Sequence, residues 1–557
     1  MNPSKRPNIL VIMTDEERFP PPYENAEAKA WRLQHCPGRE AIARNSIRCQ
    51  NHYTGATACS PARATLFTGQ YPSLHGVSQT PGMGKSSFDP AMFWLDAASL
   101  PTMGHWFQAL GYQTYYRGKW HLSDEDLLVP GTRTALLTTD TEGNPIPSKM
   151  RNYQAANRLK PYGWDGWIGP EPHGALEAND GTNRDPGFAD QVCRTLDELE
   201  AKARAGDERP FVLVSSFVNP HDIVFFDVDW FDEFREQLRE GDLPQVDPAP
   251  TAGEDLSSKP SCQADYASQY PLFYLPQPDI ARYRQFYYWL MAEVDSHIDR
   301  VYQKLQQCSF FEDTIVVFTS DHGEMLGAHG GLHQKWYNAY EETLHVPFYL
   351  SYPAGLKPGE HQGLTSHLDL LPTLLGLAGA GTREQQALAE TFKARYTEAA
   401  PLVGQDLSPW LRDADDGQPR TLYFMSDDTV ETGADMRGAH SGKPYRPVTE
   451  PKHLETIITT EIPGGRWKFS RYFDNPRFSE GPGNADGLPV PTGVPEQFEC
   501  YNLDSDPLEL INLMAEENRS QLPDQVLGQL RLLLAEQRVS KRRLPQNLNQ
   551  EPAQDLG

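Results

Sequence analysis

Three short, largely apolar segments of this chain each end in polar side chains. Residues 8–14 lead into Asp15, residues 211–217 lead into His221 through Asn-Pro, and residues 313–320 lead into Asp321 and His322. Apolar runs of this length are typical of strands that are buried on both faces of a sheet. In open α/β sheets, sites form at the carboxyl ends of the strands. We therefore expect these polar groups to meet at one edge of a sheet.

Helical patterns lie between the segments. Over residues 283–307, apolar side chains recur with helical spacing at Phe286, Leu290, Val294, Ile298, Val301 and Leu305. Strands that alternate with helices predict an α/β fold with a mainly parallel sheet. Two stretches, 130–190 and 240–275, are rich in Pro, Gly, Asp and Ser, and we expect them to be long insertions over the rim of the site.

The chain has 557 residues, of which 38% are hydrophobic. This composition is typical of a globular protein, and the length exceeds what one core of roughly 250–300 residues accommodates. We predict a larger α/β domain over residues 1–415 and a smaller α+β domain over residues 416–557. In the second part, residues 421–425 and 466–469 are predicted strands, residues 523–537 a predicted helix, and the last residues a loose tail or an oligomer arm.

The charge and the N-terminus exclude some partners. A formal net charge of −26 argues against a nucleic-acid partner, which needs a basic surface. The apolar stretch of residues 8–13 is too short for a membrane span of about 20 residues, and no small-residue cleavage site follows it. We therefore expect a cytoplasmic protein without a membrane partner.

The seven cysteines form neither a disulfide framework nor a CxxC metal pattern. Six of them are expected to be buried thiols. The seventh stands in Cys59-Ser60-Pro61-Ala62-Arg63, before a segment with helical character, and a helix N-terminus favours negative charge. From these residues alone, Cys59 is either an activated thiol beside an arginine or a buried structural cysteine.

The pentapeptide resembles the maturation motif Cys-x-Pro-x-Arg of the sulfatase branch of the alkaline phosphatase superfamily. Its continuation through Thr68-Gly69, Pro72 and His75-Gly76-Val77 is also similar to that family. The resemblance extends from about residue 7 to residue 512, where residues 501–513 resemble the Asp-Pro-x-Glu-x-x-Asn-Leu stretch of many sulfatases. It implies the superfamily's α/β fold and the conversion of Cys59 to formylglycine by a formylglycine-generating enzyme.

The resemblance also implies a complete site. One divalent metal, Ca²⁺ or alternatively Mn²⁺, would be bound by Asp15, Cys59, Asp321 and His322. The family's second signature resembles residues 111–121 and implies roles in the sulfate pocket for Lys119 and His121. The remaining roles implied are sulfate binding by Lys335, protonation of the leaving group by His221 and stabilisation of the charged nucleophile by Arg63.

This chain departs from the family's pattern at several positions. Glu16 stands where many sulfatases carry a second Asp, which leaves open whether it reaches the metal. His322 stands where many carry Asn, a feature shared with some sulfatases and with phosphonate monoester hydrolases. Arg117 replaces a small or aliphatic residue, and the nearby His333 is an alternative to Lys335 in an alignment.

The resemblance implies a sulfatase that hydrolyses an aryl sulfate or a related ester through the hydrate of formylglycine. One hydroxyl of the hydrate would attack sulfur, His221 would protonate the leaving oxygen, and His121 would act as the base that helps to expel sulfate. The alternatives are a phosphonate monoester hydrolase or phosphodiesterase with the same nucleophile and, more remotely, an unmodified, non-catalytic binding protein. We expect a homodimer or a homotetramer.

Overall fold

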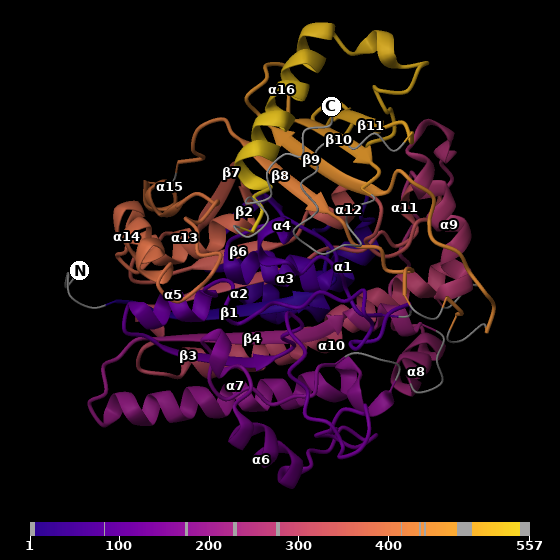
Figure 1. Ribbon diagram of the computed structural model, residues 1–557. Helices are drawn as coiled ribbons and strands as arrows, with labels where there is room; N and C mark the ends of the chain where they lie inside the picture. The colour runs from indigo at the N-terminus through magenta and orange to yellow at the C-terminus, as the bar shows by residue number, and fades with distance from the viewer. Residues whose placement is uncertain are drawn as a thin grey trace.

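The computed structural model describes residues 6–82, 84–172, 176–226, 231–274, 279–413, 415–433, 436–438, 442–475 and 493–545. A seven-stranded sheet with the order β3-β4-β1-β5-β6-β2-β7 lies at its centre (Figure 1). The strand β6 is antiparallel to both of its neighbours, and the other pairs are parallel. The strands are β1 Asn8–Asp15, β2 Ile47–Tyr53, β3 Gln113–Gly118, β4 Phe211–Pro220, β5 Thr314–Ser320, β6 Phe348–Ser351 and β7 Gly359–Ser366.

Helices cover both faces of this sheet, which explains why β1 is apolar along its whole length. Ile9, Val11 and Met13 pack against one set of helices, and Leu10 and Ile12 pack against the other. The first set includes α3 (Cys59–Thr68), α5 (Met103–Ala109) and α13 (His367–Leu377). The second includes α2 (Pro37–Arg44), α7 (Gly181–Arg204) and α10 (Ile280–Gln306). The predicted α/β fold is confirmed.

The predicted long insertions are only partly irregular. The stretch 130–190 contains α6 (Pro147–Ala156) and the start of α7, and the stretch 240–275 contains α9 (Ser261–Phe273). Both helical segments carry Pro, which a sequence pattern takes as a sign of a loop. The other helices are α1 Ala26–His35, α4 Pro72–His75, α8 Asp232–Glu240, α11 Ala328–Gly331, α12 Glu341–Leu344, α14 Thr382–Phe392 and α15 Ser408–Asp413.

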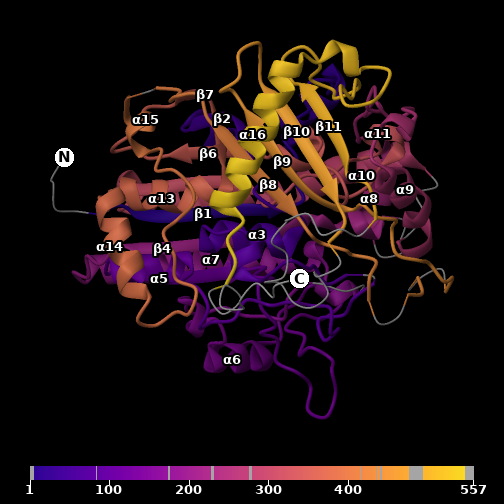
Figure 2. The ribbon, with the colours of Figure 1, turned by 45° about the horizontal axis from the view of Figure 1, so that its top comes forward.

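A second, antiparallel sheet with the order β11-β10-β9-β8 follows (Figure 2). Its strands are β8 Thr421–Ser426, β9 His453–Thr459, β10 Trp467–Phe473 and β11 Gln497–Asn502. The helix α16 (Asp524–Lys541) packs across β8 and β9. The C-terminal strands and helix expected from the sequence are therefore present. The boundary near residue 416 stays a prediction, and the expected tail lies outside the described residues from residue 546 onwards.

Buried ion pairs join the second sheet to the first part of the chain. Lys468 of β10 lies 2.8 Å from Glu341 and 2.9 Å from Glu509. Glu509 also accepts the backbone N–H of Glu341 at 2.7 Å. Lys259 donates to the carbonyl of Glu509 at 2.7 Å. Glu509, which belongs to the C-terminal motif of residues 501–513, therefore helps to hold the second sheet against the larger part of the chain.

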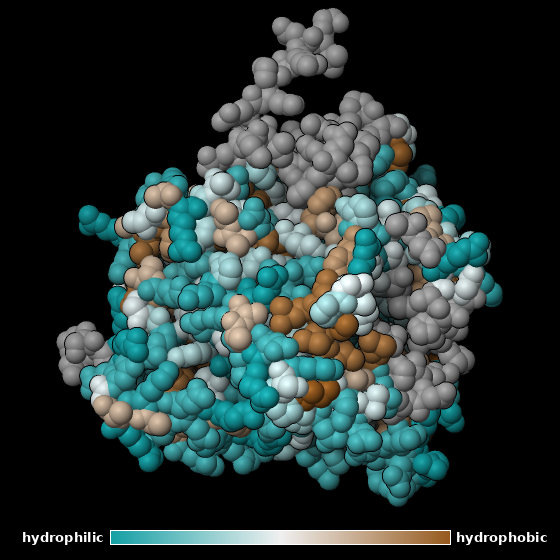
Figure 3. Space-filling model, turned by 60° about the horizontal axis from the view of Figure 1, so that its bottom comes forward, coloured by the Kyte–Doolittle hydropathy of each residue, from teal (hydrophilic) through white to brown (hydrophobic). Residues whose placement is uncertain are grey.

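The surface shown in Figure 3 is mostly hydrophilic, and the cysteines are free thiols. Figure 3 shows a patch of apolar side chains on a face that is otherwise mostly hydrophilic. No helix in the described ranges combines the length and the apolar character that crossing a bilayer requires. All seven cysteines are free, and Cys193, which is partly exposed, is the exception to the expectation that the other six are buried.

Candidate active site

The polar groups that follow the central strands meet in one place. Asp15 ends β1, and Asp321 and His322 follow β5, which is the direct neighbour of β1. Cys59 joins them from the start of α3, and ligand atoms of all four residues lie within 4.8 Å of one another. All four side chains are buried. The strand ends thus form the site that their order in the sequence predicted.

The thiol of Cys59 is held by two of these neighbours. Its S–H donates to Asp15 at 3.4 Å, and Nε2 of His322 lies 3.2 Å from the sulfur. Nδ1 of His322 lies 2.9 Å from the carbonyl of Gly323, which favours the tautomer with the proton on Nδ1. Burial and the charge of Asp15 raise the pKa of Cys59. Of the two alternatives that the residues alone leave open, full burial and the raised pKa favour a neutral, buried thiol for the unmodified residue.

Arg63 orients the two carboxylates. Its guanidinium donates to Asp321 at 2.7 Å, to Asp15 at 3.1 Å and to the carbonyl of Lys119 at 2.8 Å. Although burial opposes ionisation, Lys119 and Arg63 hold the pKa of Asp15 well below its usual range. In the described part of the chain, Arg63 thus bonds to the two acids beside Cys59, to the carbonyl of Lys119 and to the hydroxyl of Ser216 rather than to the Cys59 sulfur.

Lys119 and His121 follow directly after β3. The ammonium of Lys119 lies 2.6 Å from Asp15. The carboxylate of Glu171 accepts the backbone N–H groups of Trp120 at 3.1 Å and of His121 at 2.9 Å. His121 has a φ of 65°, so this pair of bonds fixes an uncommon backbone conformation. Glu171 lies in the stretch 130–190, where no motif indicates its role.

Glu16 binds Lys335 instead of joining the four-residue group. Lys335 donates to the Glu16 carboxylate at 2.8 Å, and the backbone N–H of Glu16 donates to Asp321 at 3.1 Å. Burial raises the pKa of Glu16 despite this lysine. The Glu16 side chain therefore contacts Lys335, which the family resemblance implies as a sulfate-binding residue. His333 stacks on Tyr270 with ring centroids 5.2 Å apart, whereas Lys335 lines the pocket described next.

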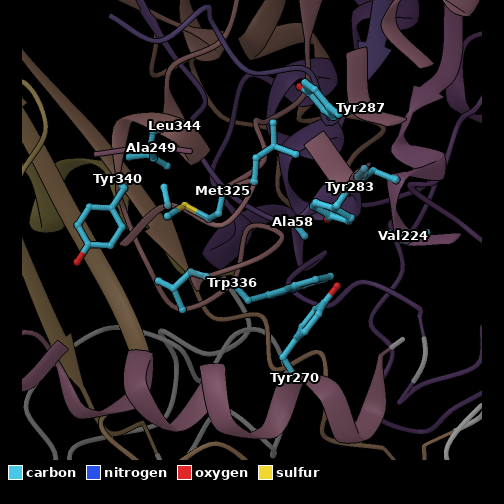
Figure 4. Close-up of a cluster of buried hydrophobic side chains, with 14 of the residues drawn as sticks. Ala58, Val224, Ala249, Tyr270, Tyr283, Tyr287, Met325, Trp336, Tyr340 and Leu344 are labelled. Atoms are coloured by element: carbon cyan, nitrogen blue, oxygen red, sulfur yellow. The ribbon is translucent and has the colours of Figure 1, made fainter. Parts of the chain in front are cut away.

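A pocket of about 470 Å³ opens onto Cys59. His121, His221 and Lys335 line it near Cys59, so four predicted site residues share one cavity. Burial and Lys119 lower the pKa of His221, so this ring is neutral near pH 7. Trp336 belongs to the same buried apolar cluster as Ala58, the residue before Cys59 (Figure 4). The other apolar lining residues are Phe88, Val224, Phe225 and Tyr274.

Comparison with known proteins identifies the family. A sequence model of the Sulfatase family matches residues 7–380. The chain belongs to the sulfatase family. It is 29% identical to choline-sulfatase of Rhizobium meliloti (strain 1021) over 388 residues. This alignment covers 68% of this chain and 69% of that protein. As a family member, this chain is a hydrolase of sulfate esters.

Solved structures agree with this sulfatase-family fold. A 2-O GAG sulfatase superposes with a TM-score of 0.58 at 19% identity, covering 98% of this chain and 94% of that one. The phosphonate monoester hydrolase of Agrobacterium radiobacter superposes with a TM-score of 0.58 at 20% identity, covering 96% of both chains. At these identities the likeness concerns the fold, which is therefore found in both a sulfatase and a phosphonate monoester hydrolase.

The donor atoms of this sulfatase-family site fit a divalent cation. Asp15 and Asp321 offer carboxylate oxygens, and the tautomer of His322 presents the lone pair of Nε2 on the side of Cys59. Hard oxygens suit Ca²⁺, and an imidazole beside carboxylates also suits Mn²⁺. Arg117, which departs from the family's pattern, bonds to Thr195 and to the carbonyl of Asp165 and does not belong to the four-residue group around Cys59.

Proposed function

We propose that this protein hydrolyses an aryl sulfate or a related sulfate ester after a formylglycine-generating enzyme has converted Cys59 to formylglycine. The observation that carries the proposal is the position of Cys59. Its side chain lies at the inner end of the pocket, within the group formed by Asp15, Asp321 and His322. A neutral, buried thiol is a poor nucleophile, whereas a hydrated aldehyde at the same position offers two hydroxyl groups.

Positive charge would balance the sulfate group. Asp15, Asp321 and His322 would bind one divalent cation, Ca²⁺ in our proposal and Mn²⁺ as the alternative. A cation there would offset negative charge on the reacting oxygens. Lys335, which lines the pocket together with Cys59, and Lys119, which lies 2.6 Å from Asp15, would bind sulfuryl oxygens. Arg63 would keep the two carboxylates in place.

The two histidines would move the protons. One hydroxyl at position 59 gives its proton to the carboxylate of Asp15, which accepts the S–H of Cys59 at 3.4 Å. Its oxygen forms a bond to sulfur while the bond from sulfur to the leaving oxygen breaks, and His221 donates a proton to that oxygen. The negative charge of a bound ester raises the pKa of His221, which is neutral in the ligand-free pocket. His121 then accepts the proton of the second hydroxyl, the carbonyl re-forms and sulfate leaves.

A second candidate function is hydrolysis of phosphonate monoesters or phosphodiesters with the same nucleophile. It is favoured by His322, which replaces the Asn of many sulfatases and whose Nε2 lies 3.2 Å from the Cys59 sulfur. The rates on an aryl sulfate and on the matching aryl phosphonate monoester separate the two. A higher kcat/KM for the sulfate supports the first function, and a higher value for the phosphonate supports the second.

Substitution of Cys59 tests the proposal. We expect Cys59→Ala to abolish turnover of an aryl sulfate while the unfolding temperature stays near that of the parent. Cys59→Ser keeps one hydroxyl but lacks the second, so we expect it to accumulate a sulfated enzyme that intact mass detects. Full turnover by Cys59→Ala would contradict the proposal and would leave a non-catalytic role for position 59.

Two further parts of the proposal concern the state of the protein in the cell. We propose a cytoplasmic location and a homodimer or homotetramer. Sedimentation of the purified protein tests the second part, and a monomer at micromolar concentration would contradict it.

A further inference from the structure

The pocket that opens onto Cys59 also has apolar walls. Phe88, Val224, Phe225, Tyr274 and Trp336 form these walls. The volume of the pocket, about 470 Å³, lies in the range of about 300–1,000 Å³ that is typical of small-ligand sites. No carboxylate is among the described residues that line it. The pocket therefore suits an apolar leaving group, and its charged side chains are cations.

One of these cations, Arg133, stands on a hairpin at the rim. The hairpin is closed by backbone bonds from Leu136 to the carbonyl of Leu127 at 2.6 Å and from Val129 to that of Thr134 at 2.9 Å. Arg133 is exposed, and its guanidinium lies over the ring of Phe88, 5.6 Å from the centroid. Within the described ranges Arg133 forms no ion pair. Its charge is therefore available to a ligand.

Lys85, another cation that lines the pocket, already has partners within the chain. The ammonium of Lys85 donates to the side chain of Gln79 at 2.5 Å and to the carbonyl of Thr429 at 2.8 Å, and it lies 3.6 Å from Asp428. Lys85 is fully buried. The ammonium of Lys85 thus binds groups of the pocket wall. Arg133 is the exposed cation that a ligand at the rim contacts.

The aromatic walls do not suit a quaternary ammonium group, although such groups bind to ring faces. Arg133 lies over the ring of Phe88, and the ammonium of Lys335 lies over the ring of Trp336 at 4.8 Å from the centroid. Two faces that a cationic ligand would use are therefore occupied by cations of the chain. A positively charged leaving group would meet repulsion without a compensating acid among the described lining residues.

We propose that the pocket selects esters whose leaving group combines an apolar, ring-sized body with a second anionic group, and that Arg133 binds this second anion. The inference rests on the proposed sulfatase function and names its substrate class. Arg133 acts as a specificity residue, since the sulfate itself would be bound beside Cys59, where Lys335 lines the pocket and Lys119 lies 2.6 Å from Asp15.

Two matched substrates test this selection. We measure kcat/KM for 4-carboxyphenyl sulfate and for its methyl ester with the parent enzyme, Arg133→Gln and Arg133→Lys. Exposed ion pairs are modest, so we expect Arg133→Gln to lower kcat/KM for the carboxylate about five-fold and to change that for the methyl ester less than about two-fold. Arg133→Lys should keep most of the preference. High salt should weaken the effect in the parent, because salt screens exposed charges.

The possible outcomes distinguish failure of the role proposed for Arg133 from failure of the proposed sulfatase function. If Arg133→Gln changes both substrates equally, or if choline sulfate is turned over better than the carboxylate, the inference is overturned while the sulfatase function stands. If the parent enzyme hydrolyses neither aryl sulfate but is active on the matching phosphonate, the proposed function fails and the inference fails with it. Comparing variants on one substrate at a time removes the intrinsic difference in reactivity between the two esters.

Discussion

At the scale of single residues, the site is a set of buried charges that bind one another. Asp15, Asp321, Arg63 and Lys119 are all fully buried. Moving such charges out of water is costly, and their attraction offsets the cost only when the geometry is good. Arg63 meets this condition, since it bonds to both carboxylates at 2.7 and 3.1 Å. The chain thus places fixed charges around position 59 before any substrate binds.

Replacing Arg63 should therefore affect stability as well as turnover. Arg63→Met leaves Asp15 and Asp321 without their shared guanidinium, and we expect a loss of about 3–5 kcal/mol in unfolding free energy. Arg204→Met is the matched control, because Arg204 also pairs with a carboxylate, Glu200, but its side chain is 74% exposed. Denaturant titration should show little change for the control. Equal stability of both variants would contradict the role assigned to Arg63.

At the scale of elements, the ends of the strands decide the site. Gly118 ends β3 with a φ of 100°, and a Cβ atom there would lie 1.7 Å from the carbonyl oxygen of Ser216 on β4. This close approach positions Lys119 and His121, which follow directly. A glycine is needed at this position for two reasons, namely the backbone conformation and the lack of space.

The test is a pair of alanine substitutions in one segment. Gly118→Ala must push β3 away from β4, and a shift of about 1 Å in the site residues can cost about 100-fold in rate. We expect kcat to fall by that order. Gly111→Ala is the control, because Gly111 also has a positive φ, 87°, but a Cβ atom there would meet nothing within 4 Å. Steady-state kinetics should show near-parent activity for this control, and a similar loss in both variants would count against the argument.

The sequence predicted these elements to different extents. β1, β4, β5 and α10 follow from apolar runs and helical spacing, because burial on both faces leaves a clear pattern. The start of α3 at Cys59 was also predictable. The roles of Glu171 and Arg133 were not, since each acts through a contact with a segment far away in the sequence or across a pocket. Glu16 shows the same limit, because only the structure reveals its bond to Lys335.

At the scale of the whole molecule, buried ion pairs connect distant parts of the chain. His329 lies 2.8 Å from Glu254 and 3.7 Å from Glu342, and Glu509 of the C-terminal motif lies close to both His329 and Glu342. Burial alone would lower the pKa of His329, but these acids raise it to about 9. The protonated ring therefore stabilises the junction between the two parts of the chain.

This junction predicts a pH dependence of stability. The pKa of His329 is above the value of about 6.5 in an unfolded chain, so its contribution is complete below about pH 6.5 and is lost as the pH rises through about 9. We expect His329→Gln to lower the unfolding temperature clearly at pH 6 and much less at about pH 10. The pKa of His297 is lowered to about 4, mainly by burial, so His297→Gln should show no such convergence at alkaline pH. A gap for His329→Gln that stays constant with pH would contradict the assignment.

The mass of the peptide that carries residue 59, taken from active protein, shows whether Cys59 has been converted to formylglycine. We predict a peptide that has lost the sulfur and two hydrogens of the cysteine side chain and has gained one oxygen. This mass should appear when the protein is produced together with a formylglycine-generating enzyme, and sulfate release should rise with the modified fraction. Active protein in which residue 59 is entirely unmodified cysteine would contradict the account.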